Sequence, residues 1–143
     1  MILLDTNVLS ELMKANVSPQ VVEWLDQQSA PDLFICAITR AEIELGICLL
    51  PDGRKKQLIA QAALGMFDEF SGRCLPFEEN SAIHYAKLVA RRQKSGRPIS
   101  VEDAQISAIA LVHGMKLATR NTRDFELINE LELINPWNRA VAK

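Results

Sequence analysis

Met1-Ile2-Leu3-Leu4-Asp5-Thr6-Asn7 begins the chain and carries most of the fold prediction. The apolar run at residues 2–4 is too short for a helix and predicts a buried strand. Directly after Asn7, apolar residues return at helical spacing, which predicts a helix that follows the strand at once. This arrangement is typical of α/β proteins with a parallel sheet. Asp5 therefore stands at the carboxyl end of a strand, where open α/β sheets bind their ligands.

The same alternation of short apolar runs and helical stripes continues along the chain. Further strands are expected at residues 33–36, 74–75, 116–119 and 131–134. No linker, internal repeat or low-complexity tract divides the sequence, and its 143 residues fit one domain. The predicted fold class is therefore α/β, as a single domain over residues 1–143. Its central, mostly parallel twisted sheet has four to five short strands flanked by about seven helices.

Acidic residues stand near the ends of these strands or at the starts of the helices. They are Asp5, Glu42, Asp103 and Asp124. Because parallel strands end at one edge of the sheet, these side chains are expected to converge there. Each acid also has a structural explanation: Thr39-x-x-Glu42 and Ser100-x-x-Asp103 match the capping box, and Asp5 and Asp124 can stabilise helix starts. Capping explains each acid singly, but not why all of them gather at one edge.

Composition narrows the possible functions. The net charge of −2 gives no overall basic field that would attract nucleic acid. This argues only weakly against a nucleic-acid partner, because the acids of a metal site contribute negative charge that bound cations would offset. Three cysteines form no C-x-x-C pair, the two histidines stand apart, and a zinc site is not expected. Cys36, Cys48 and Cys74 are interpreted as small buried hydrophobes. With no signal peptide or membrane span at the amino terminus, a cytoplasmic location is expected.

Competing α/β enzymes lack their usual motifs in this chain. A serine hydrolase needs a nucleophile elbow such as G-x-S-x-G, and a nucleotide-binding fold needs a glycine-rich first turn. A response-regulator receiver domain is a closer alternative, since its acids also bind Mg²⁺. That fold normally has adjacent acids after its first strand and a lysine after a late one, whereas Asp5 stands alone and Thr119 ends the late strand.

The motifs around the acids resemble those of the PIN-domain ribonucleases. They are Asp5-Thr6-Asn7, Thr39-x-x-Glu42, Asp103-x-x-Ile106-x-Ala108 and Thr119-Arg120-Asn121-x-x-Asp124-Phe125. Within that family the chain looks most like the VapC and FitB toxins of type II toxin–antitoxin systems, from the first strand to the last. Glu102, beside Asp103, is the one ambiguity in placing the acids, and the spacing to Ile106 favours Asp103.

The resemblance implies an Mg²⁺-dependent or Mn²⁺-dependent endoribonuclease, cytoplasmic, whose products carry a 5′ phosphate and a 3′ hydroxyl. Asp5, Glu42, Asp103 and Asp124 would hold one or two ions, because hard divalent cations prefer oxygen ligands. Side chains expected to orient water or the acids are Thr6, Asn7, Thr119 and Asn121. Candidates for RNA binding are Arg40, Arg120 and Arg123. The basic residues Arg91, Arg92, Lys94 and Arg97 fit solvated helix surface as well as phosphate contact.

The resemblance also implies partners. A VapB-like antitoxin would inhibit the protein by placing its tail in the active-site cleft, often with an arginine against the acids. Operator DNA would be bound only through that antitoxin, RNA would be the substrate, and no membrane is involved. A homodimer is expected, with Leu12, Met13 and Trp24 on exposed surfaces as candidates for the interface. The alternative function is a non-catalytic PIN-fold module that binds metal or RNA for regulation.

Overall fold

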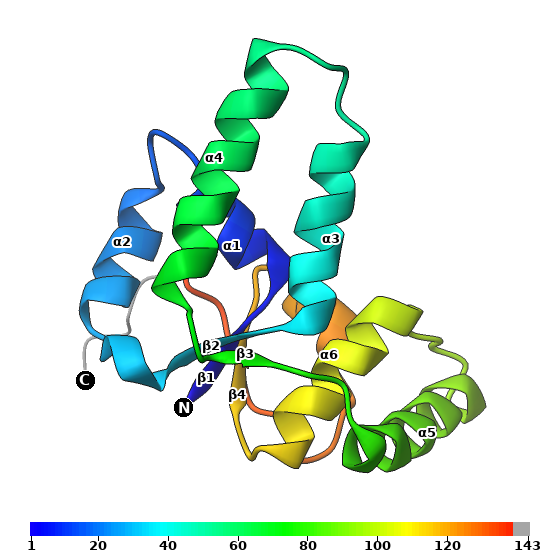
Figure 1. The fold of residues 1–143 in the computed structure, drawn as a ribbon. Coiled ribbons are helices and arrows are strands. Elements are labelled where there is room, and N and C mark those ends of the chain that lie inside the picture. Colours follow the sequence, from blue (N-terminus) through cyan, green and yellow to red (C-terminus); the bar gives the residue numbers. More distant parts are fainter. Residues whose placement is uncertain (139–143) are drawn as a thin grey trace.

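One parallel sheet forms the centre of the computed structural model, which describes residues 1–138 (Figure 1). The strand order is β3-β2-β1-β4-β5, and all four strand pairings are parallel. The strands are β1 (Ile2–Leu4), β2 (Leu33–Cys36), β3 (Cys74–Leu75), β4 (Lys116–Ala118) and β5 (Leu133–Ile134). The prediction of an α/β fold with a parallel sheet is confirmed.

Six α-helices and two short 3-10 helices surround the sheet in the described part of the chain, where about seven helices were predicted. The α-helices are α1 (Thr6–Leu12), α2 (Pro19–Asp26), α3 (Ala37–Cys48), α4 (Arg54–Glu69), α5 (Glu79–Lys94) and α6 (Val101–Val112). The 3-10 helices are η1 (Ala30–Asp32) and η2 (Thr122–Phe125). The predicted single domain extends over residues 139–143, which lie outside the described residues.

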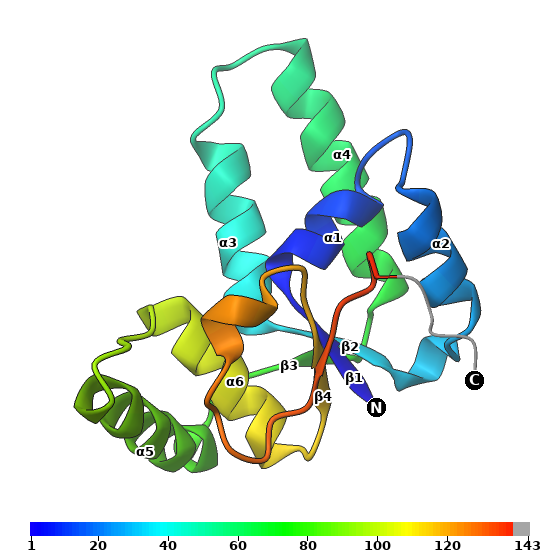
Figure 2. The same cartoon turned by 180° about the vertical axis from the view of Figure 1, so that it is seen from behind.

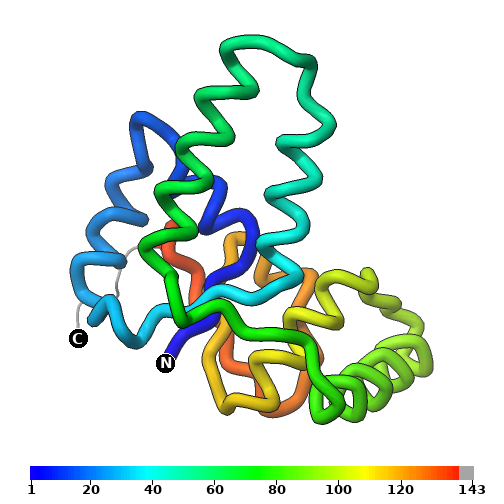
Figure 3. The backbone as a smooth tube through the Cα atoms, in the orientation of Figure 1, coloured from blue at the N-terminus to red at the C-terminus, as the bar shows by residue number. Residues whose placement is uncertain are grey.

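The side chains of β1 alternate between two apolar layers. Ile2 and Leu4 belong to a buried cluster with side chains of α1, α3 and α4, whereas Leu3 packs with α6 on the opposite face. Figure 2 shows the molecule from behind, where α6 lies beside β4. The backbone trace in Figure 3 shows α3 and α4 extending together beyond the sheet. The sheet is thus covered on both faces, and its carboxyl edge stays free for a site.

Some local predictions need correction. The last strand begins at Leu133 and not at residue 131, and β4 ends at Ala118. Cys36 is buried as predicted, but Cys48 and Cys74 are exposed. An apolar neighbourhood in sequence does not fix which side of a helix or of an edge strand a cysteine occupies.

The first helices do not present the predicted apolar surface either. Leu12, Met13 and Trp24 are partly buried and pack against the larger core cluster. Their side chains are therefore less available to a dimer partner than predicted, although Met13 also lines an open groove. Within the described residues, no helix combines the length and the apolar character needed to cross a membrane.

Candidate active site at the carboxyl edge of the sheet

Asp5 is a buried carboxylate held by several hydrogen bonds. Its main-chain N–H donates to the Ala118 carbonyl at 2.9 Å, which extends the pairing of β1 with β4 by one residue. Its Oδ1 accepts from the Thr6 main-chain N–H at 2.8 Å, so Asp5 does cap α1 as expected. Its Oδ2 accepts from the Thr119 hydroxyl at 2.7 Å and from Asn7 Nδ2 at 3.3 Å. These donors fix the orientation of the carboxylate at the carboxyl end of β1.

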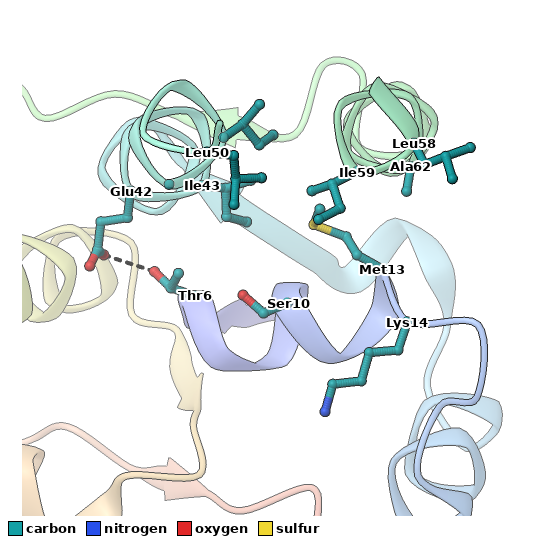
Figure 4. Close-up of a pocket in the computed structure, with 12 residues that line it drawn as sticks. Thr6, Ser10, Met13, Lys14, Glu42, Ile43, Leu50, Leu58, Ile59 and Ala62 are labelled. Atoms are coloured by element: carbon teal, nitrogen blue, oxygen red, sulfur yellow. Dashed lines mark hydrogen bonds between the residues drawn. The ribbon is translucent and has the colours of Figure 1, made fainter. Parts of the chain in front are cut away.

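Glu42 does not take part in the predicted capping box. Helix α3 begins earlier than the sequence suggested, with Cys36 as its N-cap and Thr39 as the third helical residue. The Thr39 hydroxyl donates to the Cys36 carbonyl at 2.9 Å and accepts from the Cys36 N–H. Glu42 therefore lies inside the helix, where its Oε1 accepts from the Thr6 hydroxyl at 2.8 Å (Figure 4). Capping no longer explains this acid.

Asp103 lies in the first turn of α6 and lines the same crevice as Asp5 and Glu42. Ser100 is the N-cap of that helix, as predicted, and its hydroxyl accepts from the Asp103 N–H at 3.2 Å. Glu102 is exposed and does not line the crevice. Of the two neighbouring acids, Asp103 is therefore the one that lines the crevice with Asp5 and Glu42.

Burial and mutual repulsion raise the proton affinity of these carboxylates. Desolvation raises the pKa of Asp5, against hydrogen bonds from Thr119 and Thr6, and the charges of Glu42 and Asp124 raise it further. Burial likewise raises the pKa of Glu42, with hydrogen bonding from Thr6 opposing. Burial first, and then the charge of Asp5, raises the pKa of Asp103 to about 6. The crevice therefore concentrates negative charge that positive groups would stabilise.

Asp124 lies in η2, and its backbone is anchored by Arg92, for which the sequence suggested only solvated helix surface or phosphate contact. Arg92 of α5 is buried, and its Nη1 donates to the carbonyls of Asp124 at 3.0 Å and Glu126 at 2.9 Å. Its Nε donates to the Arg97 carbonyl at 2.6 Å. Arg92 is thus not solvated helix surface, because its side chain is buried and donates to three carbonyls. It ties the turn that carries Asp124 to α5.

Comparison with known proteins identifies the fold family. The family model described as "PIN domain" matches residues 2–131. The chain belongs to the PIN-domain family. It is 40% identical to the VapC ribonuclease Y4jK of Sinorhizobium fredii (strain NBRC 101917 / NGR234), over 98% of this chain and 100% of that protein. It is 38% identical to the toxin FitB of Neisseria gonorrhoeae (strain ATCC 700825 / FA 1090), over 96% and 99%.

A solved structure agrees with these relatives. The structure of FitAB bound to an IR36 DNA fragment superposes with a TM-score of 0.88 at 39% sequence identity, and covers 98% of both chains. The predicted likeness to VapC and FitB is therefore confirmed, and it extends along almost the whole PIN domain.

The donor set of this PIN domain suits a hard divalent cation. The crevice offers carboxylate oxygens, with the hydroxyls of Thr6 and Thr119 and the amide of Asn7 already engaged with them. Within residues 1–138, no three His, Cys, Asp or Glu side chains stand together as a complete ligand set. Mg²⁺ commonly uses only one or two carboxylates and retains several waters, so a partial set fits its chemistry.

The arginines predicted to bind RNA separate into two groups. Arg40 lies over the ring of Phe67 on α4, 4.4 Å from its centroid, and its Nε is 3.6 Å from Glu44. It does not line the acidic crevice. Arg120 does line it, and Arg123 lines an adjoining hollow of about 400 Å³ with Asp103 and Asp124.

Asn121 and Asn7 connect the loop after β4 to the site. The main-chain N–H of Asn121 donates to the Thr119 hydroxyl at 3.1 Å, and Asn121 lines the crevice. Asn7 Oδ1 accepts from the Arg120 N–H at 3.1 Å. The loop is therefore held by the same side chains that orient Asp5.

An apolar groove opens beside the acids, between α1, α3 and α4 (Figure 4). Its volume is about 510 Å³, and it shares Thr6, Ser10, Lys14 and Glu42 with the acidic crevice. The side chains on its apolar walls are Met13, Ile43, Ile47, Leu50, Leu58, Ile59 and Ala62. The groove and the acidic crevice are therefore continuous, and a ligand that fills the groove would contact Glu42.

Proposed function

We propose that this PIN domain is a metal-dependent endoribonuclease and the toxin of a toxin–antitoxin pair. The observation that carries the proposal is the convergence of Asp5, Glu42 and Asp103 on one crevice, where burial and mutual repulsion raise their pKa values. Structural carboxylates are normally paired with a cation, and no ion pair within residues 1–138 involves these three. A ribonuclease and a toxin among the close relatives support the same function.

In this proposal Asp5, Glu42, Asp103 and Asp124 hold one or two Mg²⁺ or Mn²⁺ ions. When bound, such ions supply a water of lowered pKa and positive charge beside the phosphate. Thr119 and Asn7 keep the Asp5 carboxylate aimed into the crevice, and Thr6 does the same for Glu42. Because these donors are fixed before substrate binds, little reorganisation is needed when the phosphodiester is hydrolysed.

Positive side chains must also offset repulsion between the acids and the RNA backbone. Arg120 lines the crevice and Arg123 lines its adjoining hollow, which supports this role for both. Arg40 is not, because it is directed to Phe67 and Glu44. Water then attacks phosphorus and leaves a 5′ phosphate and a 3′ hydroxyl, with no protein nucleophile.

The apolar groove beside the crevice is proposed as the docking site of a VapB-like antitoxin. An apolar segment of the antitoxin would bury its side chains between α1, α3 and α4, and a basic side chain at its end would reach Glu42. The related FitAB structure is bound to DNA, which supports operator binding through the antitoxin. We further propose that the toxin acts in the cytoplasm as a homodimer, for which sedimentation of the purified protein is the check.

The test is cleavage of a pool of structured RNAs by antitoxin-free protein in Mg²⁺ or Mn²⁺, and then with EDTA, with the cut ends mapped. Asp5→Asn keeps an acceptor for the Thr6 N–H, so the cap of α1 survives while the charge is lost. Cleavage that needs metal, leaves 5′ phosphates and is lost in Asp5→Asn is the expected result. Folded protein that binds metal and RNA but cleaves nothing would instead indicate a regulatory PIN module.

A further inference from the structure

Arg120 and Trp137 form a cation–π pair that lines the crevice. The guanidinium carbon of Arg120 lies 5.0 Å from the centroid of the Trp137 ring, and both residues line the crevice with Asp5, Glu42 and Asp103. Trp137 is partly buried against the larger core cluster, and its main-chain N–H donates to Asn135 Oδ1 at 2.9 Å. The indole is therefore a fixed support on which the guanidinium rests.

The backbone of Arg120 is fixed as well. Its main-chain N–H donates to Asn7 Oδ1, and Asn7 Nδ2 donates to Asp5 Oδ2. The Asn7 side chain thus links the backbone of Arg120 to the buried carboxylate of Asp5. Arg120 is exposed, and none of the ion pairs in the described part of the chain involves it. A planar cation is thus held here without a direct ion pair, near the Glu11 carboxylate, which binds Lys14 and also senses the charge of Arg120.

We propose that Arg120, supported by Trp137, is a stacking platform for one unpaired nucleobase of the RNA, next to the phosphate that is cut. Unpaired bases stack on aromatic rings and on guanidinium planes, whereas the bases of a duplex are already stacked on each other. The platform would thus select single-stranded segments at the crevice. This inference rests on the proposed function, because it names the form of RNA that the same site takes.

The chain contains only two tryptophans, Trp24 and Trp137, so a fluorescence test can isolate the platform. Trp24→Phe leaves Trp137 as the sole indole, and Asp5→Asn prevents cleavage during titration. The probes are a short single-stranded RNA, the same RNA base-paired to its complement, and the same backbone with abasic riboses. We expect the single-stranded RNA to quench Trp137 fluorescence, and the duplex and the abasic backbone to bind without quenching it.

Arg120→Lys separates stacking from simple charge. Lysine keeps the positive charge but has no plane, so single-stranded RNA should bind about 10-fold more weakly while the abasic backbone binds equally well. Trp137→Phe retains a ring under Arg120 and should largely preserve the affinity. Arg54→Lys, an exposed arginine at the start of α4, is the matched control and should change neither affinity.

Equal affinity for single-stranded RNA with and without the Arg120→Lys substitution would overturn the platform, as would equal quenching by the abasic backbone or no RNA binding at all. These readouts do not depend on turnover. RNA cleavage by the native protein without a Trp137 response would refute the platform and leave the nuclease standing. Quenching of Trp137 fluorescence by single-stranded RNA, with no cleavage by the native protein, would support the platform and refute the nuclease.

Discussion

Replacing Asp103 with asparagine should stabilise the metal-free protein above pH 6. Asp103 is half-buried in the first turn of α6, and burial followed by the charge of Asp5 raises its pKa from 3.8 to about 6. Ionisation of Asp103 therefore costs more free energy in the folded chain than in the unfolded chain, and it destabilises the fold. Asparagine removes the charge at nearly the same volume, and its main-chain N–H can still donate to the Ser100 hydroxyl.

The size of the effect follows from that pKa. A rise from 3.8 to about 6 corresponds to about 3 kcal/mol, at about 1.36 kcal/mol for each tenfold change in proton affinity. Because part of Asp103 is exposed, solvent screening reduces this to about 1.5 kcal/mol. Loss of a favourable interaction with the helix dipole subtracts about 0.5 kcal/mol. The variant should therefore gain about 1 kcal/mol, or about 4 °C in Tm for a domain of this size.

The pH dependence has a definite sign. A carboxyl whose folded-state pKa is raised contributes stability that is fully present below pH 3.8 and is lost as the pH rises through about 6. The free energy of unfolding of the native protein should thus fall across this window more steeply than that of Asp103→Asn. The raised pKa values of Asp5 and Glu42 act in the same direction in both proteins.

Urea unfolding in EDTA at several pH values between about 4 and about 8 is the assay, since this range spans the titration of a group with a raised pKa. Glu102→Gln is the matched control, because Glu102 is the exposed neighbour of Asp103 in the same helical turn. It loses the helix-dipole interaction and relieves only the weak repulsion of Glu102 on Asp103 and Glu42, so it should gain far less stability than Asp103→Asn. Asp103→Asn that is destabilised at the alkaline end of this range, or whose pH profile runs parallel to the native one, would refute the electrostatic account of the crevice.

Three further predictions test other parts of the account. Mn²⁺ at about 100 times its dissociation constant should stabilise the native protein by about 2.7 kcal/mol and so raise its melting temperature, and this rise should be smaller in Asp103→Asn. An unchanged melting curve in millimolar Mn²⁺ would count against convergence of the acids. Arg92→Met should lower the free energy of unfolding by about 3 kcal/mol in urea, since it removes a buried charged donor that binds three carbonyls, and a loss below about 1 kcal/mol would contradict its anchoring role. Leu58→Glu should weaken antitoxin binding at least about 10-fold by calorimetry and spare RNA cleavage, whereas Leu64→Glu, exposed on the same helix but outside the groove, should change neither.

The sheet and the acids could be read from sequence because they follow simple periodic rules. The apolar run before Asp5 is β1, and its side chains alternate between the two layers as a buried strand requires. Most residues of α6 from Ala104 to Ala110 are buried, as expected for a helix that is apolar almost all round. Such patterns are local, so one sequence is enough to show them.

Other features of the site depend on contacts between distant residues, which local pattern cannot show. Arg40 stands two residues before Glu42, but residues at that spacing do not share a helix face, and the arginine turns to Phe67. Arg92 looks like the other basic residues of α5, yet the carbonyls it binds at residues 124 and 126 come from a distant turn. Trp137 stands near the end of the chain, and no local motif connects it to Arg120.

The most direct test of the central claim compares Glu42→Gln with Glu44→Gln in an RNA cleavage assay in Mn²⁺. Both residues belong to α3, but Glu42 faces Thr6 and the crevice, whereas Glu44 is exposed beside Arg40. The account predicts a loss of at least about 100-fold in the cleavage rate for Glu42→Gln, and a native rate for Glu44→Gln. Native cleavage by Glu42→Gln, or equal loss in both variants, would contradict a catalytic site built from these carboxylates.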